Sequence, residues 1–297
     1  MTLPGDAVRE AVARALAEDA AGDDVTTRWS VPDGLRASAV VRAKEPGVVA
    51  GLPVAEEVFR QVDRGLSVRP LVADGARVAA GDPLLSVHGP ARAIITGERT
   101  ALNFLQRMCG IATLAAAFVA AVDGLPVRVL DTRKTAPGLR LLDKYAVLAG
   151  GAANHRRDLA AMALLKENHV TAAGGVAAAI KAVREGMVLD GRDLLVAVEV
   201  ETVEEAEEAL RAGASWLMLD DMSPADMRRV VELRASLAAD RTVTLEASGN
   251  VRLDTVRGIA ATGVDAVSVG ALTHSVRALD LSLSVLGGRA PIPPDVR

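Results

Sequence analysis

The sequence predicts an α/β protein built from two parts. From residue 127 onward, short apolar segments without polar alternation are each followed by a segment of helical periodicity, which is typical of a parallel sheet covered by helices. Before residue 90, short segments alternate polar and apolar residues between glycine turns, which indicates small antiparallel strands. The 297 residues are enough for two such parts with their own cores.

The first element expected is a helix over residues 6–19. The spacing of Val8 and Val12 gives it one apolar face, and Asp6 is the expected N-cap because its carboxylate can accept hydrogen bonds from the first turn. Strands are expected at 37–44 and within 66–90. This part is therefore predicted to mix helices with antiparallel strands.

Residues 91–122 have the composition of helices, and we expect two of them, broken at Cys109-Gly110. The longest apolar run, 111–122, is too short to span a bilayer and predicts a buried helix. The tail over 278–288 alternates again and is expected to return to the first part.

Six strands are expected in the second part, separated by helical segments. Six clear strands, with a further one that the pattern does not locate, favour a barrel or a partly open barrel. The expected strands are 127–131, 162–166, 194–200, 216–220, 242–247 and 265–270.

Composition excludes several classes of function. A formal charge of −4 and an aromatic content of 2% argue against nucleic-acid partners and membrane surfaces. The single cysteine cannot form an intrachain disulfide, and the N-terminus MTLPGDAVRE lacks the apolar core of a signal peptide. We therefore expect a cytoplasmic protein.

Polar residues follow every expected strand of the second part. Because the carboxyl ends of parallel strands meet at one face, these residues predict a ligand site there. They are Asp131-Thr132-Arg133-Lys134, Lys166, Glu199 with Glu201, Asp220 with Asp221, Ser248-Gly249-Asn250, and Ser268 with Gly270.

The charges of these strand ends separate along the chain. Cations dominate from 128 to 166, and clustered arginines suit carboxylate or phosphate. In the next two strand ends acids dominate, and an acidic pair on neighbouring strands suits Mg²⁺, which takes a few carboxylates together with phosphate oxygens. The sequence thus predicts a phosphorylated Mg²⁺ substrate and a second anion held by arginine. Neither a Walker pattern nor a dinucleotide fingerprint is present, so ATP and NAD are poorly supported.

The four histidines and Ser248 give further expectations. His155, beside Arg156, is expected to contact a ligand, whereas His169 could either do so or orient Lys166. Ser248 has no evident base in the sequence, which argues against a nucleophilic triad. His88 and His274 are expected to be structural, and no His/Cys/Asp set has zinc-ligand spacing.

Several long motifs carry a resemblance to a known family. They are DTRKTAPGLRLLDKYAVLAGG, NHR and LLKENH, with GERTALNFLQRMCGIAT upstream and EASGN and SVGALTHS downstream. In this order they resemble the quinolinate phosphoribosyltransferases, from DDVTT at 23–27 to the last strand. The segment AANHRRDL departs from the family pattern on either side of its intact HR pair.

The resemblance implies a fold, an assembly and an activity. The fold is an N-terminal α/β sandwich domain (1–110, joined by 276–297) and a seven-stranded open α/β barrel that is catalytic (111–275). The assembly is a homodimer, or a multiple of dimers, with shared active sites. The activity transfers phosphoribosyl from phosphoribosyl pyrophosphate to quinolinate with decarboxylation, giving nicotinate mononucleotide, pyrophosphate and CO₂.

The resemblance also implies residue roles. Arg133, Arg156, Lys166 and His155 would surround the two carboxylates of quinolinate, and Arg99 would reach the partner's site. Thr132 would contact substrate, and Lys134 would contact phosphoribosyl pyrophosphate. Ser248, Gly249 and Gly270 would bind the 5′-phosphate, and Glu199 and Asp220 would hold Mg²⁺ as cofactor. The implied catalytic set is Lys134, Lys166, Glu199 and Asp220.

Three alternatives stay open at this point. A related phosphoribosyltransferase could use another acceptor, although the intact NHR and KENH motifs weigh against it. A Schiff-base aldolase could use Lys166, whose cationic neighbours make such chemistry conceivable. A phosphate-binding barrel without catalysis would not require the complete acidic and basic sets.

Overall fold

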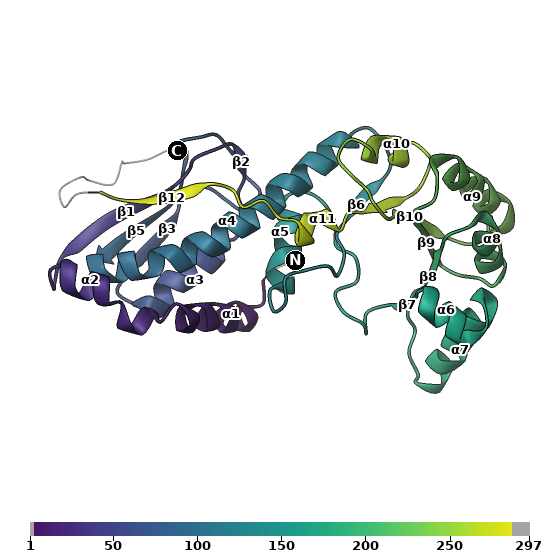
Figure 1. The fold of residues 1–297 in the computed structure, drawn as a ribbon, viewed down its shortest axis with the longest axis horizontal. Helices are drawn as coiled ribbons and strands as arrows, with labels where there is room; N and C mark the ends of the chain where they lie inside the picture. The colour runs from purple at the N-terminus through teal and green to yellow at the C-terminus, as the bar shows by residue number, and fades with distance from the viewer. Residues whose placement is uncertain (1–2, 287–297) are drawn as a thin grey trace. The chain divides into compact units, whose positions relative to one another are not determined.

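The computed structural model describes residues 3–286. The chain forms two compact units, a first unit of Met1–Ala116, Thr135–Gly151 and Ser275–Arg297, and a second unit of Ala117–Lys134 and Ala152–His274. Residues 135–151 thus group with the first unit, whereas the sequence prediction placed them in the second. The mixed α/β class is confirmed, and Figure 1 shows the two units.

The first unit contains a four-stranded antiparallel sheet in the order β12-β1-β5-β3. Its C-terminal strand pairs with β1, Val285 lying opposite Ala39, so the expected return of the tail is confirmed (Figure 1). A two-stranded sheet joins β2 to β4. The strands are β1 (Arg36–Ala43), β2 (Gly47–Val48), β3 (Ser67–Pro70), β4 (Arg77–Val78), β5 (Pro83–Pro90) and β12 (Leu281–Leu286).

Helices accompany this sheet, and the first of them corrects one prediction. Helix α1 begins at Gly5 with Pro4 as its N-cap, so the assignment of Asp6 as N-cap was wrong. Asp6 lies in the first turn, where its carboxylate pairs with Arg9 instead. The helices are α1 (Gly5–Glu18), η1 (Ala21–Asp23), α2 (Val25–Ser30), α3 (Leu52–Val62), α4 (Ala91–Ala121) and α5 (Arg140–Ala149).

The predicted break at Cys109-Gly110 was wrong, because α4 runs unbroken from Ala91 to Ala121. A Cβ atom on Gly110 would lie 2.2 Å from the carbonyl oxygen of Arg277. This glycine therefore allows the chain at residue 277 to approach the helix closely, and it does not end the helix.

Helix α4 is long and apolar enough to cross a membrane by length and composition. Of its most apolar 18-residue window, 56% is buried inside the protein, and side chains such as Leu105, Met108 and Ile111 are almost fully covered. We therefore interpret α4 as a core helix.

The second unit contains a six-stranded parallel sheet in the order β6-β11-β10-β9-β8-β7. All six expected strands are found. Beside β6, an isolated parallel bridge joins Leu130 to Ala153 at the outer position where a seventh strand would lie. The strands are β6 (Arg128–Leu130), β7 (Ala163–Leu165), β8 (Val196–Val200), β9 (Trp216–Asp220), β10 (Thr244–Ser248) and β11 (Ala266–Ser268).

Helices connect these strands and pack along the sheet (Figure 1). Ser223 and Thr202 cap two of them, accepting hydrogen bonds from the backbone amides of Asp226 and Glu205. The helices are α6 (Glu167–Ala173), α7 (Val176–Leu189), α8 (Val203–Arg211), α9 (Pro224–Leu237), α10 (Val256–Ala260) and α11 (Ala271–His274).

The register of the sheet places polar residues level with one another. Glu199 on β8 lies beside Met218 on β9, which lies beside Glu246 on β10. Two residues further on, Asp220 lies beside Ser248. Because side chains alternate between faces along a strand, these two rows point to the same face of the sheet.

Candidate active site

A cavity of about 350 Å³ opens at the carboxyl ends of the parallel strands in the second unit. It brings together most of the predicted site residues, which confirms that the strand ends converge although it does not test their individual roles. Its lining consists of Thr132, Arg133, Lys134, His155, Arg156, Leu164, Lys166, Glu199, Met218, Asp220, Glu246, Ser248 and Ser268.

Three of the residues to which the resemblance assigns a role lie outside this lining. Gly249 follows β10 with φ at 86°, and a Cβ atom there would lie 2.4 Å from Oδ1 of Asp221, so the turn requires glycine. Gly270 follows β11, with the side chains of His274 and Lys134 against it. Arg99 is an exposed residue of α4 in the first unit.

One wall of the cavity is cationic. Arg133 and Lys134 lie in the turn after β6, where the backbone amide of Lys134 donates to Thr132 Oγ1 at 3.1 Å. Arg156 donates from Nη1 to the carbonyl of Met162 at 3.0 Å. Burial lowers the pKa of Arg156, and the positive charge of Arg133 lowers it further. Two guanidinium groups that repel each other in a cavity form a binding site for an anion.

Another part of the lining is acidic and forms the acidic wall. Glu199 Oε2 forms an ion pair with Nζ of Lys166. The exposed Glu201 has a raised pKa, caused first by the charge of Glu167 and also by burial, Asp220 and Glu199. These strand ends therefore hold a surplus of negative charge, which a cation carried by the substrate would relieve.

The acidic wall fits Mg²⁺ only when phosphate oxygens complete the coordination. Within residues 3–286, no group of three or more His, Cys, Asp or Glu side chains has the arrangement of a metal site. Glu199 and Asp220 still supply two carboxylates on neighbouring strands, which is the usual protein share for Mg²⁺ bound with a phosphorylated substrate.

Other sequence predictions concern the histidines. His169 Nδ1 accepts from the backbone amide of Lys166 at 3.1 Å, so this histidine orients the start of α6. His88 Nδ1 lies 3.0 Å from Ser38 Oγ in the antiparallel sheet of the first unit, in keeping with a structural role.

Sequence reasoning missed Glu246. The residue stands within an apolar strand, TVTLEAS, two positions before Ser248 and therefore on the same face of the sheet. An acidic residue at a core position of a strand was the signal that could have revealed it.

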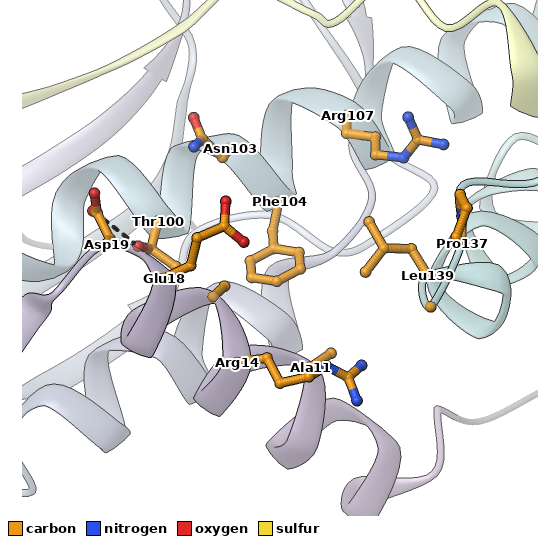
Figure 2. Close-up of a pocket in the computed structure, with 12 residues that line it drawn as sticks. Ala11, Arg14, Glu18, Asp19, Thr100, Asn103, Phe104, Arg107, Pro137 and Leu139 are labelled. Atoms are coloured by element: carbon orange, nitrogen blue, oxygen red, sulfur yellow. Dashed lines mark hydrogen bonds between the residues drawn. The ribbon is translucent and has the colours of Figure 1, made fainter.

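A larger hollow of about 570 Å³ lies in the first unit, between α1, α4 and residues 137–139. Figure 2 shows Arg14 and Glu18 of α1 and Arg107 of α4 around it. Arg107 is engaged by Asp143, to which it donates two hydrogen bonds of 2.9 and 2.7 Å. This hollow does not collect the strand-end residues, so the cavity of the second unit is the candidate active site.

Comparison with known families identifies the chain. A model described as the quinolinate phosphoribosyl transferase C-terminal domain matches residues 111–284, and the corresponding N-terminal domain matches residues 24–109. The chain belongs to the quinolinate phosphoribosyltransferase family. The resemblance of the sequence motifs is thereby confirmed.

Named members of the quinolinate phosphoribosyltransferase family are similar over nearly the whole chain. A nicotinate-nucleotide pyrophosphorylase [carboxylating] from Mycobacterium leprae is 45% identical over 285 residues, covering 94% of this chain and 98% of its own. A mitochondrial quinolinate phosphoribosyltransferase [decarboxylating] from Nicotiana glauca is 43% identical over 289 residues, covering 94% of this chain and 82% of its own.

The fold of the family agrees as well. The structure of a nicotinate-nucleotide pyrophosphorylase from Francisella tularensis superimposes with a TM-score of 0.87 at 37% identity. The match covers 96% of this chain and 98% of that one.

Proposed function

We propose that this chain is a decarboxylating quinolinate phosphoribosyltransferase of de novo NAD biosynthesis. It transfers phosphoribosyl from phosphoribosyl pyrophosphate to quinolinate and releases nicotinate mononucleotide, pyrophosphate and CO₂. The observation that carries the proposal is a cavity whose lining includes both Arg133 with Arg156 and Glu199 with Asp220. One wall suits a dicarboxylate, and the other suits a metal-bound pyrophosphate.

In this mechanism the protein contributes position and charge. The pyridine nitrogen of quinolinate attacks C1 of the ribose while pyrophosphate departs, and the oxocarbenium character of the transition state requires no protein nucleophile. Lys134 and Lys166 stabilise the negative charge that moves onto the leaving group and the bound substrates. The positive pyridinium nitrogen then stabilises the carbanion left at C2 when the 2-carboxylate departs as CO₂, and C2 takes a proton from solvent to give nicotinate mononucleotide.

Glu199 and Asp220 would hold Mg²⁺, which supplies charge neutralisation to the pyrophosphate when bound. The ion pair from Lys166 to Glu199 keeps both side chains at the acidic wall before substrate enters.

Acceptor specificity follows from the cationic wall. Nicotinate lacks one of the two carboxylates and would leave a partly buried guanidinium without its anion. A site that binds a polar group disfavours an analogue without that group strongly. We therefore assign the second anion to quinolinate, with Arg133, Arg156, Lys166 and His155 around it and Thr132 in contact with substrate.

Assembly and location belong to the same proposal. A homodimer would let the exposed Arg99 of one subunit reach the site of its partner. The 5′-phosphate of the substrate would be bound by Ser248, Gly249 and Gly270. We place the protein in the cytoplasm, although the Nicotiana glauca relative is named mitochondrial.

The test mixes the protein with Mg²⁺, phosphoribosyl pyrophosphate and quinolinate labelled at the 2-carboxylate, and follows labelled CO₂. Release only when all three are present is the expected result. Turnover of nicotinate without CO₂ would assign the chain to another acceptor, and no turnover of either acceptor would overturn the proposal.

A further inference from the structure

Glu246 is a buried acid at the centre of the parallel sheet. It lies level with Met218 on β9 and Ala266 on β11, and none of its surface is exposed to solvent. Burial of an ionised carboxylate is costly unless donors surround it. The identity of its donors therefore indicates what this residue does.

Two ring nitrogens lie close to one oxygen of Glu246. The indole Nε1 of Trp216 donates to Oε2 at 2.7 Å, and Nε2 of His155 lies 3.2 Å from the same atom. The two rings pack edge to face, with centroids 5.7 Å apart and planes at 68°. In the described part of the chain, the other oxygen, Oε1, is buried without a hydrogen-bond partner.

The second nitrogen of His155 fixes its tautomer. Nδ1 accepts from the backbone amide of Arg156 at 2.7 Å, so it carries no proton. The proton of the neutral ring therefore sits on Nε2, which lies 3.2 Å from Oε2 of Glu246.

The same contacts fix the loop that carries Arg156. The backbone amide of His155 donates to Oδ1 of the buried Asp131 at 2.8 Å, which ties the loop to the end of β6. The side chain of His155 packs with its Nε2 against Glu246 of β10. The position of the Arg156 amide depends on this ring.

We propose that Glu246 is a positioning residue for the dicarboxylate half of the cavity, acting through His155 on Arg156. The inference rests on the proposed function, because it concerns how the cavity binds quinolinate. Quinolinate at neutral pH offers carboxylates and a ring nitrogen, all of them acceptors. An acidic side chain cannot bind those groups directly and contributes by holding the residues that do.

The first experiment compares three variants by calorimetry and steady-state kinetics. Glu246→Gln can keep an acceptor oxygen for both rings, Glu246→Ala removes it, and Trp216→Phe removes only the indole donor. We expect Glu246→Ala to raise the Kd and KM of quinolinate about tenfold or more while kcat and the affinity for phosphoribosyl pyrophosphate change less than about threefold. Glu246→Gln and Trp216→Phe should stay within about threefold of the parent protein for quinolinate.

The second experiment needs no Ala variant. The chain has 4 histidines, so ¹⁵N spectra of histidine-labelled protein can resolve the ring of His155, assigned by His155→Asn. We expect the neutral Nε2–H tautomer in the parent protein and in Glu246→Gln, with and without quinolinate.

Several results would overturn the inference. Unchanged quinolinate affinity in Glu246→Ala, or an equal loss for both substrates, would remove the positioning role. So would an Nδ1–H or doubly protonated ring in the parent protein. If the parent protein itself binds no quinolinate, the proposed function fails and this inference falls with it, a result distinct from any variant effect.

Discussion

Lys166 and Glu199 come from neighbouring strands, and their side chains form an ion pair at the mouth of the cavity. The lysine side chain is 49% exposed and the glutamate side chain 12% exposed. An exposed pair of this kind contributes only about 0–1 kcal/mol to stability. The pair is better explained by what it does for a bound substrate than by what it does for folding.

Replacement of Lys166 should therefore separate activity from stability. We expect Lys166→Ala to lower kcat/KM about 100-fold, because a charge that stabilises the transition state is lost. Its urea midpoint should stay near that of the parent protein. The matched control is Lys181→Ala, which removes an exposed ion pair on α7 in which Lys181 Nζ lies 3.8 Å from Glu185 Oε1. This variant should change neither activity nor stability. A large loss of stability in Lys166→Ala would contradict this interpretation.

Arg133 should affect the affinity for quinolinate but not the affinity for phosphoribosyl pyrophosphate. We expect Arg133→Ala to abolish measurable quinolinate binding by calorimetry while phosphoribosyl pyrophosphate still binds, because only the dicarboxylate loses its guanidinium partner. Arg157→Ala is the control, since Arg157 is exposed and paired with the adjacent Asp158 at 3.1 Å. Unchanged quinolinate affinity in Arg133→Ala would refute the assignment of the cationic wall.

Asp143 should be important for stability. Its side chain is fully buried, accepts both hydrogen bonds from Arg107 and accepts a third from the backbone amide of Ala136 at 3.1 Å. We expect Asp143→Ala to cost about 3–5 kcal/mol, because it leaves the guanidinium of a buried pair uncompensated. Urea denaturation followed by circular dichroism measures this loss. Asp226→Ala, at an exposed pair on α9, should cost much less, and equal losses would argue against the role of burial.

Asp24 should contribute to the loss of stability in acid. Hydrogen bonds from the side chain and backbone amide of Thr27 lower its pKa below the ordinary 3.8. A lowered pKa in the folded state gives stability that is present above pH 3.8 and lost as the pH falls through the folded value. Asp24→Ala, which removes the N-cap of α2, should cost about 1 kcal/mol at neutral pH. The variant should also show a smaller loss of stability below pH 3.8, and an identical acid profile would contradict this prediction.

Cys109 should resist labelling in the folded protein. Burial raises the pKa of its thiol to about 12, so almost no thiolate is present at neutral pH. Because it is the single cysteine, its reaction with a disulfide reagent reports opening of the structure around α4. We expect slow labelling that accelerates in urea in step with unfolding. Rapid labelling without denaturant would show that α4 is exposed.

The sequence predicted the elements that depend on local pattern. All six parallel strands and the returning tail were found, because their apolar runs are set by burial on one or both faces. The convergence of strand-end residues on one cavity followed from the parallel order.

What the sequence did not predict depends on distant contacts. Gly110 suggested a helix end, but it serves the close approach of residue 277, which is far along the chain. Asp6 suggested a cap, but the helix begins one residue earlier. The importance of Glu246 became visible only when folding placed His155 and Trp216 against it.

The pairing of β12 with β1 has a consequence for synthesis of the protein. The first unit receives its last strand from residues 281–286, after the whole second unit has been made. Until then β1 keeps an open edge that can pair with another chain, a recognised hazard for aggregation. The second unit must therefore be synthesised before β12 can pair with β1 and cover the open edge of the first sheet.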